Sequence, residues 1–371
     1  MKLLNLSVYR DGTGFARSSI DHILAMDSVG IDIALRPIRL SGINAKIPNR
    51  LIELEKKDLN NVTHVLQHYL PQMFTWKHSV KNIGMFHVET THFKPSRWNF
   101  NCNLMDGIVV NSTQNQHACI NSLVKPHVTV IPQPIDINKF KKEYPSLQID
   151  TNNKYVFYAI GDYSYRKNYE QLIRAYLNTF DKNDDTVLIL KVYVSGKTQQ
   201  DSLNHITSFI NECKQKLRKF TTAMFPEIIV ISQYLTDDQI NAIHQIGHCF
   251  VSVERGAGIC LPAMDAVGFG NAVISPDWGG HTDFLTGYEG TQYVTSNLIS
   301  CYGVNINECP YTDLYTCHEE WCDPDYMSLC NNLLVAYKQQ RGRSKYNNHN
   351  FVNVHNYESV GNIWKNYLLN V

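Results

Sequence analysis

The sequence lacks the features that mark several large classes of protein. Its 371 residues carry no formal net charge, because 34 Lys and Arg balance 34 Asp and Glu. An even balance argues against a nucleic-acid backbone or an anionic membrane as the main partner. No stretch reaches the roughly 18 uninterrupted apolar residues of a membrane-spanning helix, and the short apolar start predicts a strand instead of a secretory signal. We therefore expect a cytoplasmic protein, with membrane association unsupported.

Cysteine is present, but not in a pattern typical of metal binding. The 10 cysteines form no Cys-x-x-Cys pair, and a chain of this size does not need disulfides to be stable. Five of them lie between Cys301 and Cys330. Zinc is an alternative there, but the spacing favours reduced thiols, so we expect a reducing compartment and no metal site.

Short β-branched runs alternate with helical patterns along most of the chain, which predicts parallel sheets with helices on both faces. The expected strands are 3–9, 31–37, 63–69, 83–89, 107–111, 128–132, 155–161, 186–193, 227–233, 249–254 and 272–276. The expected helices are 15–28, 113–123, 168–180, 200–220, 237–247, 259–267, 323–341 and 357–369.

A polar segment without periodicity, Lys139–Lys154, is the expected linker. The predicted fold class is α/β, with two Rossmann-like, doubly wound domains that face each other across a cleft. We expect these domains at 1–145 and 152–350, with a closing helix in 351–371 that can pack back on the first domain. In such sheets ligands bind at the carboxyl ends of the strands.

A strand end, two glycines and a helix start coincide in Glu254-Arg-Gly-Ala-Gly-Ile. Gly256 and Gly258 let the backbone approach a ligand, and the helix N-terminus offers N–H groups to an anion, most naturally a phosphate. Asp265 lies about two turns into the predicted helix, where it can accept hydrogen bonds from a ribose. A tight turn with a solvated Asp explains the same residues equally well, because a lone Gly-x-Gly is a weak signal.

Two cations at another helix start strengthen the phosphate hypothesis. Arg166 and Lys167 precede the helix expected from residue 168 and oppose its dipole, at a cost of about 0.3–1 kcal/mol each. An anion should therefore lie nearby. Asp162 or Glu170 would be a structural partner, whereas a diphosphate would be a functional one.

A third turn of this kind joins the first strand to the first helix at Asp11-Gly-Thr-Gly14. A simple turn explains it in isolation, but three anion-favouring turns in one chain point to a phosphate-bearing ligand. No strand is followed by Gly-x-Gly-x-x-Gly, because residues 12–17 are Gly-Thr-Gly-Phe-Ala-Arg. A dinucleotide-dependent dehydrogenase is therefore disfavoured.

Several further segments occur along the chain, and together with these turns they form an ordered set of motifs. They are His87-Val-Glu89-Thr with Trp98, Val109-Val-Asn-Ser112, Val128–Asp136, Arg166-Lys-Asn168, Arg255–Asp265, Trp278-Gly-Gly-His and Trp321-Cys-Asp-Pro-Asp. Taken together, the segments resemble those of GT-B glycosyltransferases, specifically the retaining family 4 (glycosyl transferases group 1). The resemblance covers most of the chain, and the joint match is specific although each segment alone is not.

The resemblance implies a GT-B fold and transfer of a hexose from a nucleotide sugar, most simply UDP- or GDP-linked. The acceptor would be a hydroxyl of a glycan, lipid or protein, and the transfer would proceed with retention, without metal or another cofactor. Arg166 and Lys167 would hold the diphosphate leaving group. His87 and Glu89 would line the sugar and acceptor side.

Family motifs also imply the donor-binding residues. Gly14 would let the backbone approach the phosphates, Asp265 would bind the ribose, and the backbone around Tyr234 would contact the base. The turn residues complete the set: Gly256, Ala257, Gly258 and Ile259. Asp323-Pro-Asp325 mimics a metal-binding Asp-x-Asp, but it opens a predicted helix, which favours a capping role.

Three positions depart from the family pattern. Ala257 stands where the family has the first of two paired glutamates, and Asp265 stands for the second, one methylene shorter. Asp162 stands where many members have a basic residue. A catalytically degenerate GT-B protein, acting as a sugar- or nucleotide-binding or assembly module, is the main alternative. A phosphorylase or sugar-nucleotide epimerase is a weaker one, and charge neutrality disfavours a DNA-targeting glycosyltransferase.

Overall fold

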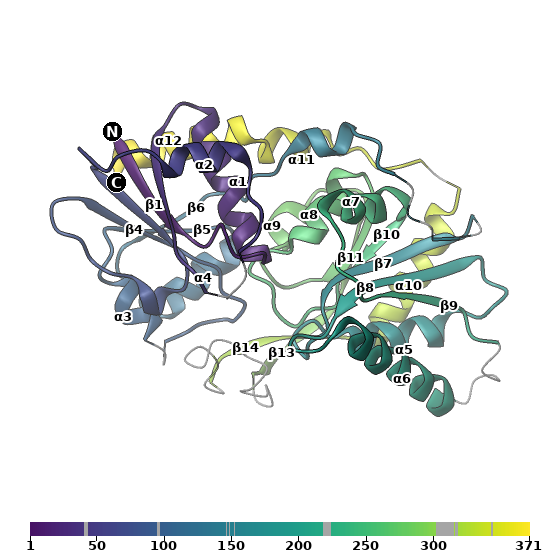
Figure 1. Ribbon diagram of the computed structural model, residues 1–371. Helices are drawn as coiled ribbons and strands as arrows, with labels where there is room; N and C mark the ends of the chain where they lie inside the picture. Colours follow the sequence, from purple (N-terminus) through teal and green to yellow (C-terminus); the bar gives the residue numbers. More distant parts are fainter. Residues whose placement is uncertain are drawn as a thin grey trace. The chain divides into compact units, whose positions relative to one another are not determined.

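The chain folds into two compact units (Figure 1). A computed structural model describes residues 1–40, 44–94, 97–145, 147, 149–151, 153–217, 224–301, 315, 318–342 and 344–371. Unit 1 comprises Met1–Ile137, Ser300–Glu320 and His349–Val371, and unit 2 comprises Asn138–Ile299 and Trp321–Asn348. No helix in these described ranges is long and apolar enough to cross a bilayer.

Unit 1 contains a parallel six-stranded sheet in the order β2-β1-β3-β4-β5-β6. Its strands are β1 (Lys2–Ser7), β2 (Asp32–Pro37), β3 (His64–His68), β4 (Lys81–Met85), β5 (Gly107–Val110) and β6 (His127–Val130). Its helices are α1 (Gly14–Ser28), α2 (Asn49–Glu55), η1 (Pro71–Met73), α3 (Trp98–Cys102), α4 (Thr113–Asn121), α11 (His349–His355) and α12 (Tyr357–Asn370). A short 3-10 helix, η2 (Ile137–Lys141), begins at the last residue of this part of the unit.

Both faces of this sheet are buried, as the near-continuous apolar strands predict. Val109 packs in one core with α1, α2 and α12, whereas its neighbours Ile108 and Val110 pack in a second core with α3 and α4. Figure 1 shows the same division, with α1, α2 and α12 on one side of the strands and α3 and α4 on the other. The alternation of side chains along a strand therefore separates the two layers.

The C-terminal helix α12 belongs to unit 1 and packs closely on α1. A Cβ at Gly361 would lie 2.2 Å from the carbonyl oxygen of Ala25, so the two helices approach each other backbone to backbone. Trp364 is fully buried beside this contact, and its indole Nε1 donates a hydrogen bond to His22 Nδ1 at 2.9 Å. The last helix thus completes the core of the first sheet.

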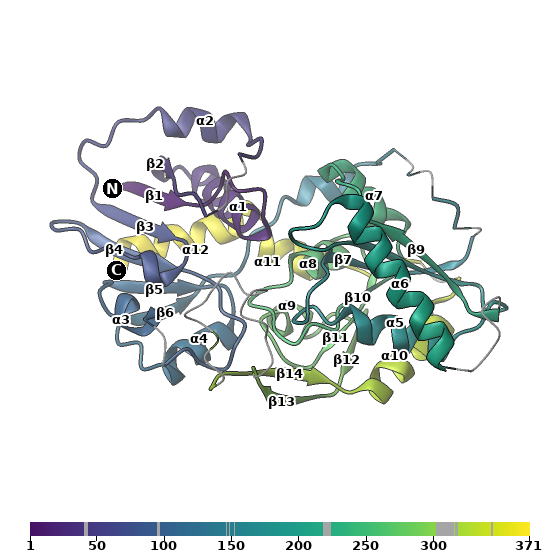
Figure 2. The same cartoon turned by 60° about the horizontal axis from the view of Figure 1, so that its bottom comes forward.

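Unit 2 repeats the architecture with a parallel sheet in the order β12-β11-β10-β7-β8-β9 (Figure 2). Its strands are β7 (Tyr155–Asp162), β8 (Thr186–Tyr193), β9 (Glu227–Ile231), β10 (Cys249–Val251), β11 (Ala272–Pro276) and β12 (Thr291–Val294). Its helices are α5 (Tyr169–Thr179), α6 (Gln199–Leu217), α7 (Asp237–Ile246), α8 (Leu261–Gly268), α9 (Thr282–Leu285) and α10 (Tyr326–Gln340). The chain leaves unit 2 at the end of β13 (Ser296–Ser300) and returns through β14 (Glu320–Pro324), and these two strands pair.

Local capping explains where several helices begin. Ser112 accepts a hydrogen bond from the backbone N–H of Asn115 at 3.2 Å and opens α4, as predicted. Thr236 and Gln239 form a reciprocal capping box at α7. Asp325 accepts from Ser328 N at 2.7 Å and caps α10, which confirms the capping role predicted for this acid.

The structure corrects two sequence predictions. The strand expected at 83–89 ends at Met85, so His87 and Glu89 follow the strand instead of lying in it. The polar segment from Lys139 was expected to be a linker, but Lys139 is buried in unit 2 and Phe140 packs against the backbone of Gly268. A Cβ at Gly268 would lie 1.9 Å from the Phe140 ring, so this glycine makes room for the aromatic side chain.

Candidate functional site

In unit 2, a cluster of charges forms where β7 and β10 end. Lys167 Nζ donates to Glu254 Oε2 at 2.5 Å, and the Arg166 guanidinium lies 3.5 Å from the same oxygen. Arg166 also donates to the carbonyl oxygen of Gly256 at 2.6 Å. Arg166 and Lys167 were predicted to need an anion, and Glu254 is that partner, although it lies 87 residues away in sequence from Lys167.

Glu254 is buried, and its environment keeps it ionised. Burial alone would raise its pKa, but the Lys167 and Arg166 charges and the hydrogen bonds from Cys260 and Lys167 lower it to about 2. Burial likewise favours the neutral amine of Lys167, but the Glu254 charge, together with smaller contributions from Cys260 and Asp162, offsets this and raises the pKa of Lys167. Two cations and one carboxylate leave this cluster with a net charge of about +1 at neutral pH.

The two acids expected as structural partners play smaller parts. Asp162, at the end of β7, helps to raise the pKa of Lys167, but Glu254 contributes more. Glu170 pairs with Arg174 at 3.3 Å. Asn168 adopts the left-handed conformation, with φ of 57°, and forms the N-cap of α5, so the cations lie on the turn that leads into that helix.

The glycine turn before α8 lies directly beside this cluster. Ser252 Oγ donates to Glu254 Oε1 at 3.1 Å, and the Cys260 thiol donates to the same oxygen at 2.9 Å. The carbonyl oxygen of Ala257 accepts from the backbone N–H of Gly280 at 2.9 Å. These bonds fix the backbone from Ser252 to Cys260 around the carboxylate.

The predicted turn residues therefore adjoin the cation pair. Gly256, Ala257 and Gly258 are buried, whereas Ile259 is partly exposed. Arg255 follows Glu254 and stacks over the Tyr165 ring at 4.0 Å. Its guanidinium also lies 3.3 Å from the carboxylate of Asp323.

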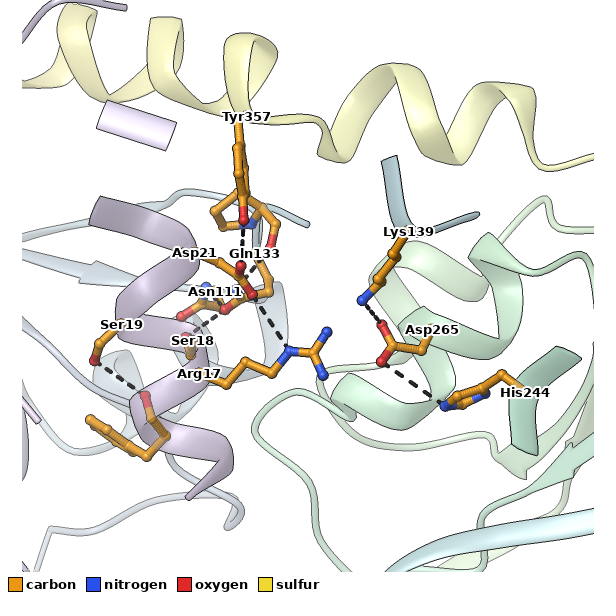
Figure 3. Close-up of polar contacts among 12 residues, drawn as sticks. Arg17, Ser18, Ser19, Asp21, Asn111, Gln133, Lys139, His244, Asp265 and Tyr357 are labelled. Carbon is orange, nitrogen blue, oxygen red and sulfur yellow. Dashed lines mark hydrogen bonds and ion pairs between the residues drawn. The ribbon is translucent and has the colours of Figure 1, made fainter. Parts of the chain in front are cut away.

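Asp265, the predicted ribose contact, lies in the interior of unit 2 and is bonded to other protein groups. It is buried in α8, and one of its carboxylate oxygens accepts a hydrogen bond from the buried Lys139 ammonium (Figure 3). Its other oxygen lies 4.0 Å from His244 Nε2. Tyr234, in contrast, has 85% of its side chain exposed after the end of β9.

In unit 1, the Gly14 turn opens helix α1. Thr13 caps the helix by accepting from Ala16 N at 3.2 Å, and the exposed residues 12–14 lie at its N-terminus. One turn on, Arg17 lies 3.9 Å from Asp21, whose other oxygen accepts from Tyr357 at 2.7 Å (Figure 3). The N-terminus of α1 is therefore exposed at residues 12–14, whereas its second turn is tied to α12.

His87 is the outermost member of a row of three histidines. His22 and His68 are fully buried, and the His68 and His87 Nε2 atoms lie 3.5 Å apart. Burial lowers the pKa of all three, and that of His87 to about 4. The row is therefore neutral at physiological pH.

The hydrogen-bond donors around the row determine where its protons lie. Ser18 Oγ donates to Gln133 Oε1 at 2.5 Å, so this hydroxyl accepts from His87 Nε2 at 3.2 Å. His87 Nδ1 is thus an acceptor, and it has no hydrogen-bond partner in the described part of the chain. Ser19 Oγ donates to Phe15 O and accepts from His68 Nδ1, both at 3.2 Å, so His68 Nε2 faces the His87 proton as an acceptor.

The inner end of the row is fixed from α12. An indole N–H only donates, so the bond from Trp364 makes His22 Nδ1 an acceptor and places its proton on Nε2. That atom faces the side-chain amide of Asn111 at 2.8 Å. The amide accepts this proton when its oxygen is turned towards the ring.

The remaining predicted residues have simpler surroundings. Glu89 is partly buried and accepts from the hydroxyl of Tyr315 at 3.1 Å. The described residues contain no group of three or more His, Cys, Asp or Glu placed to hold a metal ion. Cys309 and Cys317, part of the cysteine-rich stretch, lie outside the described residues.

Sequence reasoning assigned no role to four members of these sites: Glu254, Lys139, His22 and His68. Glu254 carried a signal, because an acid directly after a buried β-branched strand needs a counter-charge. Lys139 did not, because it lies in a run of lysines that is typical of exposed chain. The histidine row depends on strand order, which places the ends of β3 and β4 side by side.

Comparisons with known proteins identify the fold. Neither a protein-family model nor a curated protein sequence matches the chain. Among solved structures, HepE of Anabaena in complex with UDP and glucose is 13% identical, with a TM-score of 0.65 over 100% of both chains. Trehalose-6-phosphate synthase OtsA is 11% identical, with a TM-score of 0.68 over 100% of this chain and 99% of its own.

A third similar structure is sucrose-phosphate synthase of Thermosynechococcus elongatus, which is 14% identical with a TM-score of 0.62. The match covers 99% of this chain and 98% of that one. At these identities the likeness establishes the fold alone. It confirms the predicted fold class: the chain is an α/β protein with the two Rossmann-like, doubly wound units of the GT-B fold.

Proposed function

We propose that this protein is a retaining, metal-independent glycosyltransferase. In this proposal it moves a hexose from a UDP- or GDP-linked sugar to a hydroxyl of a glycan, lipid or protein acceptor. The observation that carries the proposal is the cation pair of Arg166 and Lys167, held beside the buried carboxylate of Glu254 at the carboxyl edge of the second sheet. This is the edge where doubly wound sheets bind their ligands.

The proposed chemistry uses the cation pair as an electrostatic catalyst. When the bond between the sugar and the diphosphate breaks, negative charge develops on the leaving phosphate, and positioned cations stabilise it. Glu254 accepts only one bond from the Lys167 ammonium in the described structure, and an ammonium has three N–H groups. Glu254 therefore orients Lys167 without removing its capacity to bind a phosphate.

In the proposed retaining reaction no protein side chain becomes glycosylated. The departing phosphate takes the proton of the acceptor hydroxyl while that oxygen bonds to the anomeric carbon. Two residues of unit 1 suit the proposed roles by their own chemistry: His87 Nδ1 is a buried acceptor that suits a sugar hydroxyl, and Glu89 suits the acceptor side. The backbone at Gly14 suits a phosphate, because it is exposed at a helix N-terminus.

Ligands of the similar structures support the choice of donor. HepE was solved with UDP and glucose, and a trehalose-6-phosphate structure from E. coli was solved with UDP-2-fluoro glucose. We infer a nucleotide sugar for this chain from that likeness together with the cation pair. Gly256, Ala257, Gly258, Ile259, Asp265 and Tyr234 are the proposed contacts to the rest of the donor.

A binding panel tests the donor site. We expect one of UDP, GDP, ADP, CMP and TDP to raise the midpoint of thermal unfolding, because a ligand at about 100 times its Kd stabilises by roughly 2.7 kcal/mol. Lys167→Ala should lose most of that shift. Lys154→Ala is the matched control, because Lys154 pairs with Glu227 at 2.9 Å just before β7, at the opposite edge of the sheet.

Transfer itself is tested with the nucleotide sugar that binds. We expect wild type to release the nucleoside diphosphate, and NMR of the product should show the anomeric configuration of the donor. Inversion would refute the retaining mechanism but not the donor site. A wild-type protein that no nucleotide or nucleotide sugar shifts at millimolar concentration would refute the proposal.

A second candidate is a non-catalytic GT-B protein that binds a sugar or nucleotide. The observation that favours it is Asp265, the proposed ribose contact, because its carboxylate is already bonded to Lys139. Ala257 also lacks the carboxylate that family 4 members place there. Nucleotide binding without any transfer or donor hydrolysis would support this candidate, and transfer that Lys167→Ala abolishes would exclude it.

A further inference from the structure

Unit 1 exposes a group of large apolar side chains over α3, α4 and the turn after η1. Phe100, Ile120, Leu123 and Trp76 each have more than half of their surface exposed. Leu104, one turn after Phe100, is also exposed. Large exposed apolar patches on proteins commonly mark interaction sites.

Hydrogen bonds between their backbone neighbours hold these residues together. Asn103 donates to the carbonyl oxygen of Leu123 at 3.4 Å, and Asn101 donates to that of Pro71 in η1 at 2.9 Å. Gln67 accepts from Thr75 N at 2.8 Å and reaches the sulfur of Met105 at 3.4 Å. The chain neighbours of Trp76 and Leu104 therefore contact the same side chain, that of Gln67. Figures 1 and 2 both show α3 and α4 side by side.

The backbone at Leu123 indicates that its exposure is built in. Leu123 has φ of 59°, in the left-handed region that residues with a Cβ rarely adopt. Gly or Asn is the usual residue at such a position, and neither would present an apolar side chain. The fold instead holds a leucine outward at the end of α4.

Exposed basic residues occur in the same stretch of chain as this apolar group. Lys77, Lys81, Lys94, Arg97 and Lys125 are exposed, and none has an ion-pair partner in the described part of the chain. Residues 71–130 contain these five cations and two acids, a local charge of +3 in a chain whose net charge is zero. Both acids are engaged: Asp106 accepts from Asn82 N at 2.7 Å, and Glu89 accepts from Tyr315.

Sheet register places the patch away from the carboxyl edge. Ile83 pairs with Gly107, and Gly107 pairs with His127. Lys81 begins β4, Asp106 precedes β5 and Lys125 precedes β6, so all three lie at the amino ends of neighbouring strands. Ligands of doubly wound sheets bind at the opposite edge. The proposed transferase site therefore does not use this surface.

We propose that the patch of Trp76, Phe100, Leu104, Ile120 and Leu123, with its five cations, is a docking surface for a membrane that carries anionic lipids. The apolar side chains would enter the boundary between headgroups and acyl chains, and the cations would bind lipid phosphates. Each Lys or Arg near an anionic surface strengthens binding about fivefold at physiological ionic strength. The charge balance of the whole chain conceals this local excess, so total composition does not indicate it.

Sedimentation with vesicles tests the docking surface. We expect the full chain to sediment with phosphatidylcholine vesicles that contain about a third phosphatidylglycerol, and to bind pure phosphatidylcholine at least tenfold more weakly. Raising the salt from about 0.15 to 1 M should weaken binding, because the Debye length falls from about 8 to 3 Å. Equal binding to both vesicle types would overturn the proposal.

Two variants separate this surface from general adhesion. Phe100→Ser/Leu123→Ser removes exposed side chains, and Lys94→Glu/Arg97→Glu reverses charge, so each should reduce binding at least tenfold. Leu369→Ser is the matched control, because Leu369 is 68% exposed on α12. Each variant must keep the wild-type unfolding midpoint to count. Self-association of wild type through these residues, without vesicle binding, would replace the membrane by a second copy and refute the proposal.

Discussion

Glu254→Gln gives the sharpest test of the charge cluster in unit 2. The pKa of Glu254 falls from 4.5 to about 2 in the folded protein, and each pKa unit corresponds to about 1.4 kcal/mol. Ionised Glu254 therefore contributes roughly 3 kcal/mol to the stability of unit 2. The variant keeps the shape of the side chain but leaves Lys167 and Arg166 without their counter-charge.

We expect the variant to lower the unfolding midpoint of unit 2 at pH 7 by about 6–12 °C, from roughly 2–4 °C per kcal/mol for a unit of this size. The pH dependence has a definite sign. Because the folded pKa lies below the unfolded one, the contribution is complete above pH 4.5 and is lost as the pH falls towards 2. Thermal unfolding across this range should show that slope in wild type and a flatter one in Glu254→Gln.

The same variant should bind a diphosphate more tightly. Removing the carboxylate raises the local charge from about +1 to +2, so pyrophosphate should restore much of the lost midpoint. Glu227→Gln is the control, because Glu227 is 44% exposed and pairs with Lys154 on the surface, where such pairs contribute about 0–1 kcal/mol. A midpoint and acid slope equal to those of wild type would refute the reasoning.

Three other substitutions test the core contacts and the histidine row by thermal or chemical unfolding. Lys139→Met removes the ammonium that is bonded to the buried carboxylate of Asp265 and should cost roughly 3–5 kcal/mol. Gly361→Ala places a Cβ 2.2 Å from the carbonyl oxygen of Ala25 and should cost about 1–3 kcal/mol by separating α12 from α1. The pKa of His87 is lowered to about 4, so wild-type stability should fall as the pH drops from 6.5 towards 4, and His87→Gln should remove part of that fall.

Controls for these substitutions lie close to each site. Adding Asp265→Asn to Lys139→Met should recover part of the loss, because the pair then has no uncompensated charge. Lys365→Ala, exposed on the same helix as Gly361, should change stability by less than about 0.5 kcal/mol. If His87→Gln leaves the whole pH dependence unchanged, the acid sensitivity belongs to other groups.

The order of strands and helices could be predicted from periodicity because each element buries one apolar pattern. β8 (Thr186–Tyr193) and β11 (Ala272–Pro276) have the predicted bounds. Short elements could not be found this way. α3 has five residues and β12 has four, which is too little sequence for a period of 3.6 or 2 to show.

The candidate sites were only partly predictable for a different reason. The cations and glycines of a turn lie together in sequence, and the structure places Arg166 and Lys167 beside Gly256. Their counter-charge, Glu254, follows a different strand. The separation of Glu254 and Lys167 in the sequence does not indicate that their side chains meet in the fold. Lys139 resembles an exposed residue in the sequence because two more lysines follow it at 141 and 142. It is buried because its ammonium bonds to Asp265 of α8.

The packing of α12 on α1 also affects how the chain is made. Unit 2 is nearly continuous, from Asn138 to Asn348 apart from one excursion, whereas unit 1 needs residues from both Met1–Ile137 and His349–Val371. Trp364, which fills the first core, leaves the ribosome only after all of unit 2. Since domains fold as units during synthesis, the unit whose strands are made first is completed after the other, and its core must wait until α12 has been made.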